Sequence, residues 1–149
     1  MKTLVLANQK GGVGKSAVAT QLLYFHKLKL RVLVVDLDHQ RNTTNPLTLS
    51  GRARIAPFTS SQLLAGGGQP LPEGDFVLIP GDDDLSGLEK QAGKHNDFVN
   101  NLNGYLADQA DRFDCCILDT NPNPDVRYAA ALVVSDFVLS PVQLNQEAS

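Results

Sequence analysis

The chain is 149 residues long, a length that suits one domain built around one hydrophobic core. Hydrophobic residues make up 42% and charged residues 19% of the chain, so we expect it to fold rather than stay disordered. The formal net charge of -3 argues against a protein whose whole surface binds nucleic acid, although it is compatible with a local basic patch.

Short apolar runs alternate with helix-like stretches along the chain. Strands are predicted at 2–8, 31–38, 75–81, 113–120 and 136–144, and helices at 15–28, 60–68, 96–110 and 125–135, with a further helical stretch broken near Gly93. Strand–helix alternation predicts a parallel sheet, and continuous apolar runs are typical of its buried strands. We therefore predict an α/β fold: one domain over 1–149, with a doubly wound, mostly parallel sheet and helices on both faces. The segments 40–57 and 66–74 are predicted to be surface loops.

Other features of the sequence favour structural roles. Cys115 and Cys116 are neighbours on a predicted strand, which indicates reduced thiols on opposite faces rather than a disulfide. The three acids of GDDDL (81–85) are interpreted as a solvated turn and the N-cap of a helix. No apolar run is long enough to span a bilayer and no secretory signal is visible, so we predict a soluble, cytoplasmic protein.

The stretch NQKGGVGKS (8–16) lies between the first predicted strand and the first predicted helix, where a phosphate-binding loop is found. The residues predicted to bind nucleotide are Gly11, Gly12, Val13, Gly14, Lys15, Ser16 and Ala17. Lys15 would contact the β- and γ-phosphates, and the Ser16 hydroxyl would bind Mg²⁺. The first glycine of the usual pattern is replaced by Gln9, and an additional lysine, Lys10, stands beside it.

Acidic residues end two further predicted strands. Asp36 and Asp38 close the strand 31–38, and Asp119 closes the strand 113–120 in a Walker B pattern, which holds Mg²⁺. Ligands of open α/β sheets bind at the carboxyl ends of the strands, so these carboxylates are expected near the phosphates. Residues two apart on a strand share a face. One of Asp36 and Asp38 could orient an attacking water while the other helps to hold the metal.

Three segments resemble one family of ATPases. KGGVGKS, VVDLDHQRN and ILDTNP are similar to the deviant Walker A, switch and Walker B segments of the ParA/MinD family. LIPGDDDLSGLE and AAALVVSDFVLSPVQLNQEAS also resemble ParA segments, so the likeness covers essentially all 149 residues. It is greater to the ParA proteins of plasmid and chromosome partition than to other branches. The resemblance implies a P-loop NTPase sheet and a Mg²⁺-dependent ATPase with ATP and Mg²⁺ as cofactors and a weak intrinsic rate.

The resemblance also implies roles for individual residues. Lys10 corresponds to the signature lysine, which reaches across a dimer interface to the nucleotide of the other subunit. Lys15 and Asp38 would complete the catalytic set, with Asp38 positioning the attacking water. Asn42 corresponds to the switch asparagine. The residues of the metal site would be Ser16, Asp36 and Asp119.

The sequence departs from the family pattern at three positions of the switch regions. His39 stands where the family usually has proline, Arg41 where it often has glycine, and Asn121 where a small residue or proline is usual. These departures bear on the rate of hydrolysis more than on nucleotide binding. ParA proteins continue with further strands and helices, so we expect residues 1–149 to be the N-terminal part of a longer family domain.

The function that the resemblance implies is that of a partition ATPase. ATP binding would drive formation of a homodimer that binds non-specific double-stranded DNA, and a ParB-type centromere-binding protein would stimulate hydrolysis. Such a protein works in the bacterial cytoplasm, associated with the nucleoid, and needs no membrane. One alternative is a related positioning or regulatory ATPase acting on a protein or membrane surface, whether MinD-like or conjugation-related. The other is a truncated nucleotide-binding module without full activity.

Overall fold

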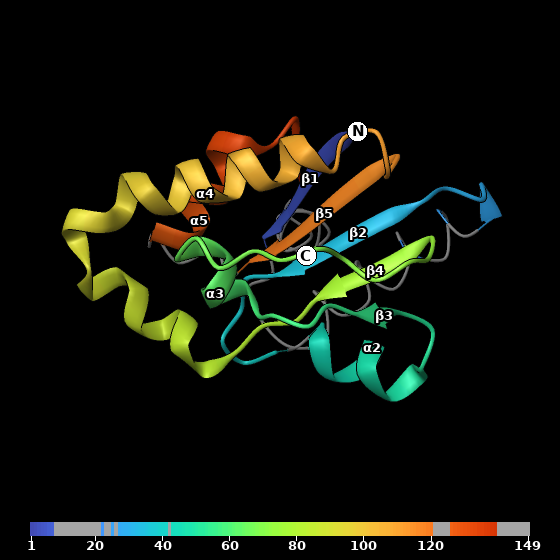
Figure 1. The fold of residues 1–149 in the computed structure, drawn as a ribbon, viewed down its shortest axis with the longest axis horizontal. Coiled ribbons are helices and arrows are strands. Elements are labelled where there is room, and N and C mark those ends of the chain that lie inside the picture. The colour runs from blue at the N-terminus through green and yellow to red at the C-terminus, as the bar shows by residue number, and fades with distance from the viewer. Residues whose placement is uncertain (8–21, 23–24, 26, 42, 121–125, 140–149) are drawn as a thin grey trace, which may run out of the picture.

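The computed structural model describes residues 1–7, 22, 25, 27–41, 43–120 and 126–139 of the chain (Figure 1). Its strands are β1 (Lys2–Ala7), β2 (Val32–Asp36), β3 (Arg54–Ile55), β4 (Phe76–Ile79), β5 (Cys115–Thr120) and β6 (Phe137–Leu139). They form one sheet in the order β3-β4-β2-β5-β1-β6, and every neighbouring pair is parallel. The predicted parallel α/β fold is therefore confirmed.

Helical segments connect the strands and cover the sheet. The described α-helices are α2 (Thr44–Ser50), α3 (Ser60–Leu64), α4 (His95–Asp108) and α5 (Val126–Val134), and the 3₁₀ helices are η1 (Asp83–Lys90) and η2 (Ala92–Lys94). Figure 1 shows α4 and α5 running side by side over one end of the sheet. Most of the predicted helix 15–28 and residues 140–144 of the last predicted strand lie outside the described part of the chain.

Each face of the sheet has its own hydrophobic core because successive residues of a strand point to opposite faces. On one face, Leu33 and Val35 of β2 belong to the cluster that includes Phe98 and Leu102 of α4. On the other face, Val32 and Val34 of β2 form a second cluster, against which Leu22, Phe25 and Leu47 pack. The central strand is thus buried on both sides, which explains its unbroken apolar sequence.

The segment 40–57 is not the plain surface loop that the sequence predicted. It contains the helix α2 and the short edge strand β3. Pro46 is tolerated because it lies in the first turn of α2, where the backbone N–H has no helical partner. Gly51 ends α2 in the left-handed region, with φ of 68°. The segment 66–74 contains no helix or strand, as predicted.

The turn before η1 also differs from the prediction in detail. Asp82 stands at the N-cap of η1 but makes no side-chain capping bond there. Its carboxylate instead accepts the hydroxyl of Thr59, at 2.6 Å, and the hydroxyl of Ser61. The acid therefore ties this turn to the start of α3 rather than capping its own helix.

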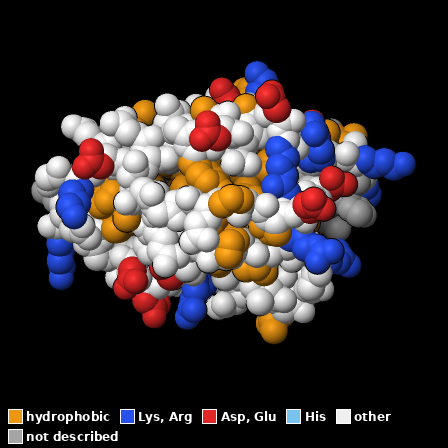
Figure 2. Space-filling view, in the orientation of Figure 1, with side chains coloured by type: hydrophobic (Ala, Val, Ile, Leu, Met, Phe, Trp, Pro, Cys, Tyr) orange, Lys and Arg blue, Asp and Glu red, His pale blue; other side chains and the backbone are white. Residues whose placement is uncertain are grey.

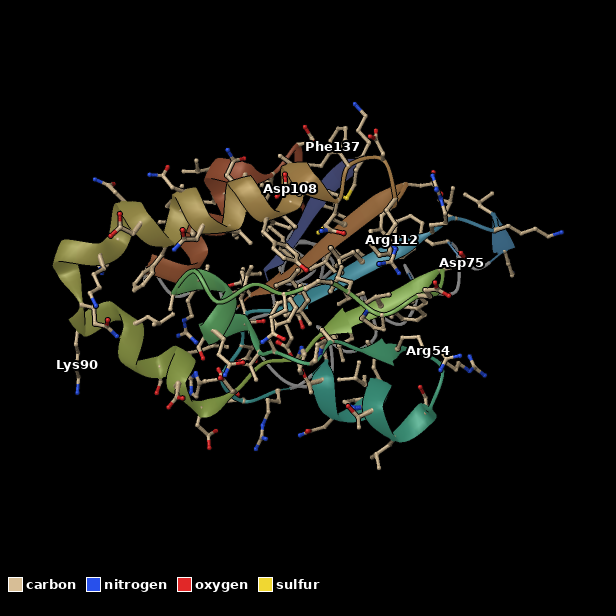
Figure 3. All side chains as sticks on the ribbon, in the orientation of Figure 1. Arg54, Asp75, Lys90, Asp108, Arg112 and Phe137 are labelled. Carbon is tan, nitrogen blue, oxygen red and sulfur yellow. The ribbon has the colours of Figure 1, made fainter. Side chains whose placement is uncertain are left out.

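Charged side chains are mixed on the surface. Figure 2 shows acidic and basic groups interspersed over the visible face. Figure 3 shows Arg54, Asp75 and Arg112 near the end of the sheet where the strands begin. There Arg112 donates to the backbone carbonyls of Leu71, Pro72 and Gly74, and so fixes the loop before β4. Within the part of the chain that the structure describes, no helix is long and apolar enough to cross a membrane.

Candidate active site

Two buried aspartates end neighbouring strands at the carboxyl edge of the sheet. Asp36 of β2 lies directly opposite Asp119 of β5, and the two residues are 0% and 1% exposed. Burial disfavours the charged form of a carboxyl group, and a second carboxylate nearby adds to the effect. Burial accordingly raises the pKa of Asp36 to about 6. Burial, together with the neighbouring Asp36, raises the pKa of Asp119 well above its ordinary value.

Two consecutive threonines at the start of α2 contact these two aspartates. Thr44 donates its backbone N–H and its hydroxyl to Asp36 Oδ2, at 2.8 and 2.6 Å. The hydroxyl of Thr43 donates to Asp119 Oδ2. Neither threonine is among the predicted site residues, because both fall in the segment 40–57, which was predicted to be a surface loop. Their position just after the switch segment was the available signal.

Asp38 reaches the site through a turn rather than through the strand. The strand β2 ends at Asp36, so the alternation argument used for Asp38 does not apply. Asp38 is nevertheless only 4% exposed, and its Oδ1 accepts the backbone N–H of Gln40 at 3.0 Å. This contact is typical of an aspartate that starts a turn. The backbone N–H of Asp38 in turn donates to Asp36 Oδ1 at 3.0 Å.

The turn continues through Arg41, whose φ of 58° lies in the left-handed region. Its N–H donates to the carbonyl oxygen of Asp38 at 3.0 Å. A side chain in this conformation costs roughly 1 kcal/mol, whereas glycine adopts it freely. Arg41 thus occupies a backbone conformation that glycine adopts more readily.

Gly81 closes the site from the end of β4. A Cβ atom at this position would lie 2.7 Å from the carbonyl oxygen of Asp38 and 3.2 Å from Asp36 Cγ. Its backbone N–H donates to the Thr44 hydroxyl at 2.8 Å. The absence of a side chain at Gly81 therefore allows the strand end to approach both acids.

An arginine from α5 also reaches this edge of the sheet. Arg127 is 7% exposed, and its Nη1 lies 3.4 Å from the carbonyl oxygen of Leu37 and 3.2 Å from His39 Nδ1. His39 Nδ1 in turn lies 3.9 Å from Asp38 Oδ1. Arg127 is not among the site residues predicted from the sequence.

The donor set is compatible with a hard cation such as Mg²⁺. In the described part of the chain, the buried Asp119 Oδ1 has no hydrogen-bond partner. Such an oxygen normally has a partner, and Mg²⁺ prefers carboxylate oxygens and water. Asp36 differs, because both of its oxygens already accept hydrogen bonds. Asp119 is thus better prepared than Asp36 for direct contact with a cation.

The remaining predicted site residues lie outside the described part of the chain. These are Lys10, Gly11, Gly12, Val13, Gly14, Lys15, Ser16, Ala17, Asn42 and Asn121. This set includes the predicted phosphate-binding loop, residues 8–16, which follows β1 in the sequence. The parallel pairing of β1 with β5 does place the start of that loop beside Asp119, because Leu6 is in register with Asp119 and Ala7 with Thr120.

Comparison with known proteins agrees with this arrangement. The profile of a family described as "AAA domain" matches residues 1–149. Protein IncC from Escherichia coli is 38% identical over 157 residues, which cover 97% of this chain and 42% of that protein. The chain belongs to the ParA/MinD family of P-loop ATPases. The chromosome-partitioning ATPase Soj from Thermus thermophilus is 34% identical over 145 residues, or 96% of this chain and 55% of Soj. The chain thus spans about half the length of these two relatives.

Solved structures of this family share the fold. Cobyrinic acid a,c-diamide synthase from Mycobacterium smegmatis, with bound ADP and magnesium, superposes with a TM-score of 0.74 at 29% identity, over 94% of this chain and 59% of that one. A plasmid partition protein from Borrelia burgdorferi, bound to AMPPNP, gives a TM-score of 0.70 at 25% identity, over 94% and 62% of the two chains. Nucleotide binding, and magnesium binding in the first case, are therefore properties that this fold supports.

Proposed function

We propose that the chain is the nucleotide-binding part of a ParA-like partition ATPase. The main support is the pair of buried acids, Asp36 and Asp119, on adjacent strand ends, with one carboxylate oxygen of Asp119 unpartnered within the described residues. The sequence that follows β1, KGGVGKS, has the deviant Walker A pattern, and β1 itself pairs with β5, which ends in Asp119 and Thr120. Family membership and the partition proteins among the relatives agree with this function.

We assign the reaction to a small set of residues. Lys15 contacts the β- and γ-phosphates of ATP, and Lys10 contacts the phosphates bound to the partner subunit. Ser16 and Asp119 would hold Mg²⁺, with Asp36 as a further acid of the site, and the bound metal would supply positive charge to the phosphates. Asp38 accepts a hydrogen bond from the attacking water and so orients it toward the γ-phosphate. A lysine supplied from the partner couples hydrolysis to dimerisation.

The proposed cycle uses nucleotide state as a switch. ATP favours the homodimer, the dimer binds double-stranded DNA without sequence preference, and a ParB-type partner stimulates hydrolysis, which resets the cycle. Such a protein acts in the cytoplasm on the nucleoid. The γ-phosphate would order the segments that contain Asp38 and Asp119, as in other nucleotide switches.

DNA binding of the full-length protein tests this proposal. The protein is sedimented with DNA in ATP·Mg²⁺ and in ADP·Mg²⁺ across a salt series. We expect binding in ATP only, weakening steeply with salt, because phosphate contacts release counterions. Lys15→Ala should abolish ATP binding, and Lys10→Ala should bind ATP without dimerising. Equal DNA binding in both nucleotides, or none in either, would contradict the partition function.

A second function is favoured by one relative. The maintenance of carboxysome distribution protein A of Gloeothece citriformis is 29% identical over 149 residues. By analogy, this chain could serve in positioning a protein cargo with the same ATP cycle. The DNA experiment does not separate the two functions if the cargo moves over the nucleoid. Affinity capture of the ATP-bound Asp38→Ala variant does, because a centromere-binding partner indicates partition and a cargo adaptor indicates positioning.

A further inference from the structure

Arg127 occupies an unfavourable position for a cation. It is the one charged residue of α5, and it sits in the first turn of that helix with only 7% of its surface exposed. The N-terminus of a helix carries a partial positive charge, which disfavours a cation. Burial of a charge adds a further penalty unless the group is hydrogen-bonded. Arginines in such positions are expected where the contacts that they make serve a purpose.

The contacts of Arg127 bracket Asp38. Its Nη1 lies near the carbonyl oxygen of Leu37, the residue before Asp38, and near the ring of His39, the residue after it. A guanidinium group has only donors, so His39 Nδ1 must accept and the ring proton must be on Nε2. One nitrogen atom of α5 thus interacts with both residues that flank Asp38.

The backbone around Asp38 is also fixed from its other side. Leu37 N–H donates to the carbonyl oxygen of Asp119 at 2.8 Å, and Asp38 N–H donates to Asp36 Oδ1 at 3.0 Å. These two bonds fix backbone N–H groups of the segment, whereas Arg127 contacts the carbonyl oxygen of Leu37 and the side chain of His39. Together they define the direction in which the Asp38 side chain leaves the backbone.

We propose that Arg127 is a positioning residue for Asp38, acting through Leu37 and His39. This inference rests on the proposed function, in which Asp38 orients the attacking water. In this role Arg127 acts on the two residues that flank Asp38 rather than on the phosphates or the water. Its guanidinium group keeps the turn after β2 in the orientation that hydrolysis requires, and it links this turn to the helix that follows the Walker B strand. A displacement of the Asp38 carboxylate by about 1 Å would reduce turnover by up to roughly 100-fold.

The experiment compares Arg127→Met and Arg127→Lys with a matched control in the full-length protein. Arg112→Met is the control, because Arg112 also donates to backbone carbonyls but lies at the opposite end of the sheet. We expect Arg127→Met to lower kcat roughly 10- to 100-fold while the Kd for ATP stays within about twofold. Arg127→Lys should restore part of the rate, because its single ammonium group supplies a donor without the guanidinium fork. Arg112→Met should leave kcat unchanged, even if it lowers Tm.

A double-mutant cycle tests whether Arg127 acts through Asp38. If it does, Arg127→Met combined with Asp38→Ala should be no slower than Asp38→Ala alone, since the group being positioned is already absent. Multiplicative losses in the double variant would overturn the proposal. A loss of ATP affinity that accounts for the whole effect would also overturn it, because that result indicates a general structural role.

Amide hydrogen exchange of the nucleotide-free protein provides a readout that does not depend on hydrolysis. The N–H groups of Asp38, Gln40 and Arg41 all donate within this turn. We expect Arg127→Met to accelerate their exchange by roughly 10-fold and Arg112→Met to leave it unchanged. Unchanged exchange in Arg127→Met would refute the proposal. A wild-type protein that hydrolyses no ATP would contradict the proposed function, whereas the effect of Arg127 on this turn would still be decided by exchange.

Discussion

Replacement of Asp36 by asparagine should change how the stability of the nucleotide-free protein depends on pH. Asp36 is fully buried, and burial raises its pKa from 3.8 to about 6. Between these two values the folded chain holds a proton that the unfolded chain releases. The contribution of Asp36 to the free energy of unfolding therefore falls as pH rises through this range, which is the reverse of ordinary acid denaturation.

The size of this effect follows from the shift in pKa. A difference of about two units, at 1.36 kcal/mol per unit, amounts to about 3 kcal/mol in the wild type between about pH 3 and about pH 8. About 2 kcal/mol of this total falls between pH 4 and pH 7, because titration is incomplete at both limits. Asp36→Asn cannot titrate, so its free energy of unfolding lacks this component at every pH.

Urea unfolding of both proteins without Mg²⁺ or nucleotide measures the difference at a series of pH values. We expect the stability of the wild type relative to Asp36→Asn to fall steadily from pH 4 to pH 7. Asp114→Asn is a control that should show no fall between pH 4 and pH 7, since hydrogen bonds from the exposed Arg31 lower the pKa of Asp114. The contribution of Asp114 is present above pH 4 and is lost on acidification. A difference between wild type and Asp36→Asn that is independent of pH would refute the raised pKa.

Three further changes have clear expected results. Gly81→Ala should destabilise the protein by about 1–3 kcal/mol and impair ATP hydrolysis, because its Cβ would lie 2.7 Å from the carbonyl oxygen of Asp38; urea unfolding and a turnover assay measure both effects. Burial raises the pKa of Tyr105 to about 12, and its hydroxyl donates to the carbonyl of Gln69, so ultraviolet titration should show a late transition that is lost in Tyr105→Phe. Its stabilising effect is complete below pH 10 and is lost as pH rises through 12. Leu102→Ala should cost about 2–5 kcal/mol in urea unfolding, because Leu102 is fully buried in the core under α4.

The sheet was predictable because its strands are buried on both faces. The sequences of β2 and β5 are apolar up to their last residues, and a short continuous apolar run is typical of a parallel strand that is covered on both sides. The helix α2 was not predictable in the same way. Its sequence, TNPLTLS, contains two threonines and a proline and has weak helical propensity. Packing of Leu47 against the second core and the contacts of Thr44 with Asp36 supply the stabilisation that the local sequence lacks.

Residues of the candidate site could be predicted only where their position at the end of a strand was enough to place them there. Asp36 and Asp119 were identified because parallel strands bring their carboxyl ends together. Thr43 and Arg127 were missed because their partners are distant in sequence. Thr43 lies 76 residues from Asp119, and Arg127 lies 88 residues from His39. Threonine hydroxyls and arginine guanidinium groups occur throughout soluble proteins. The residue type alone therefore does not tell which group the side chain will contact, and the fold is needed to identify it.

The buried acids also connect the stability of the fold to its proposed ligand. Asp36 and Asp119 are desolvated and adjacent, so each raises the cost of charging the other. A cation held by Asp119 would favour the charged form that the nucleotide-free protein disfavours. Binding free energy would then be reduced by the work of ionising the pair, and more so as pH falls. The threonine hydroxyls lower this work only in part, since each donates to a single carboxylate oxygen. Burial raises the free energy needed to ionise Asp36 and Asp119 when no ligand is bound. It therefore makes their ionisation depend on the ligand. A nucleotide-controlled switch needs such a dependence.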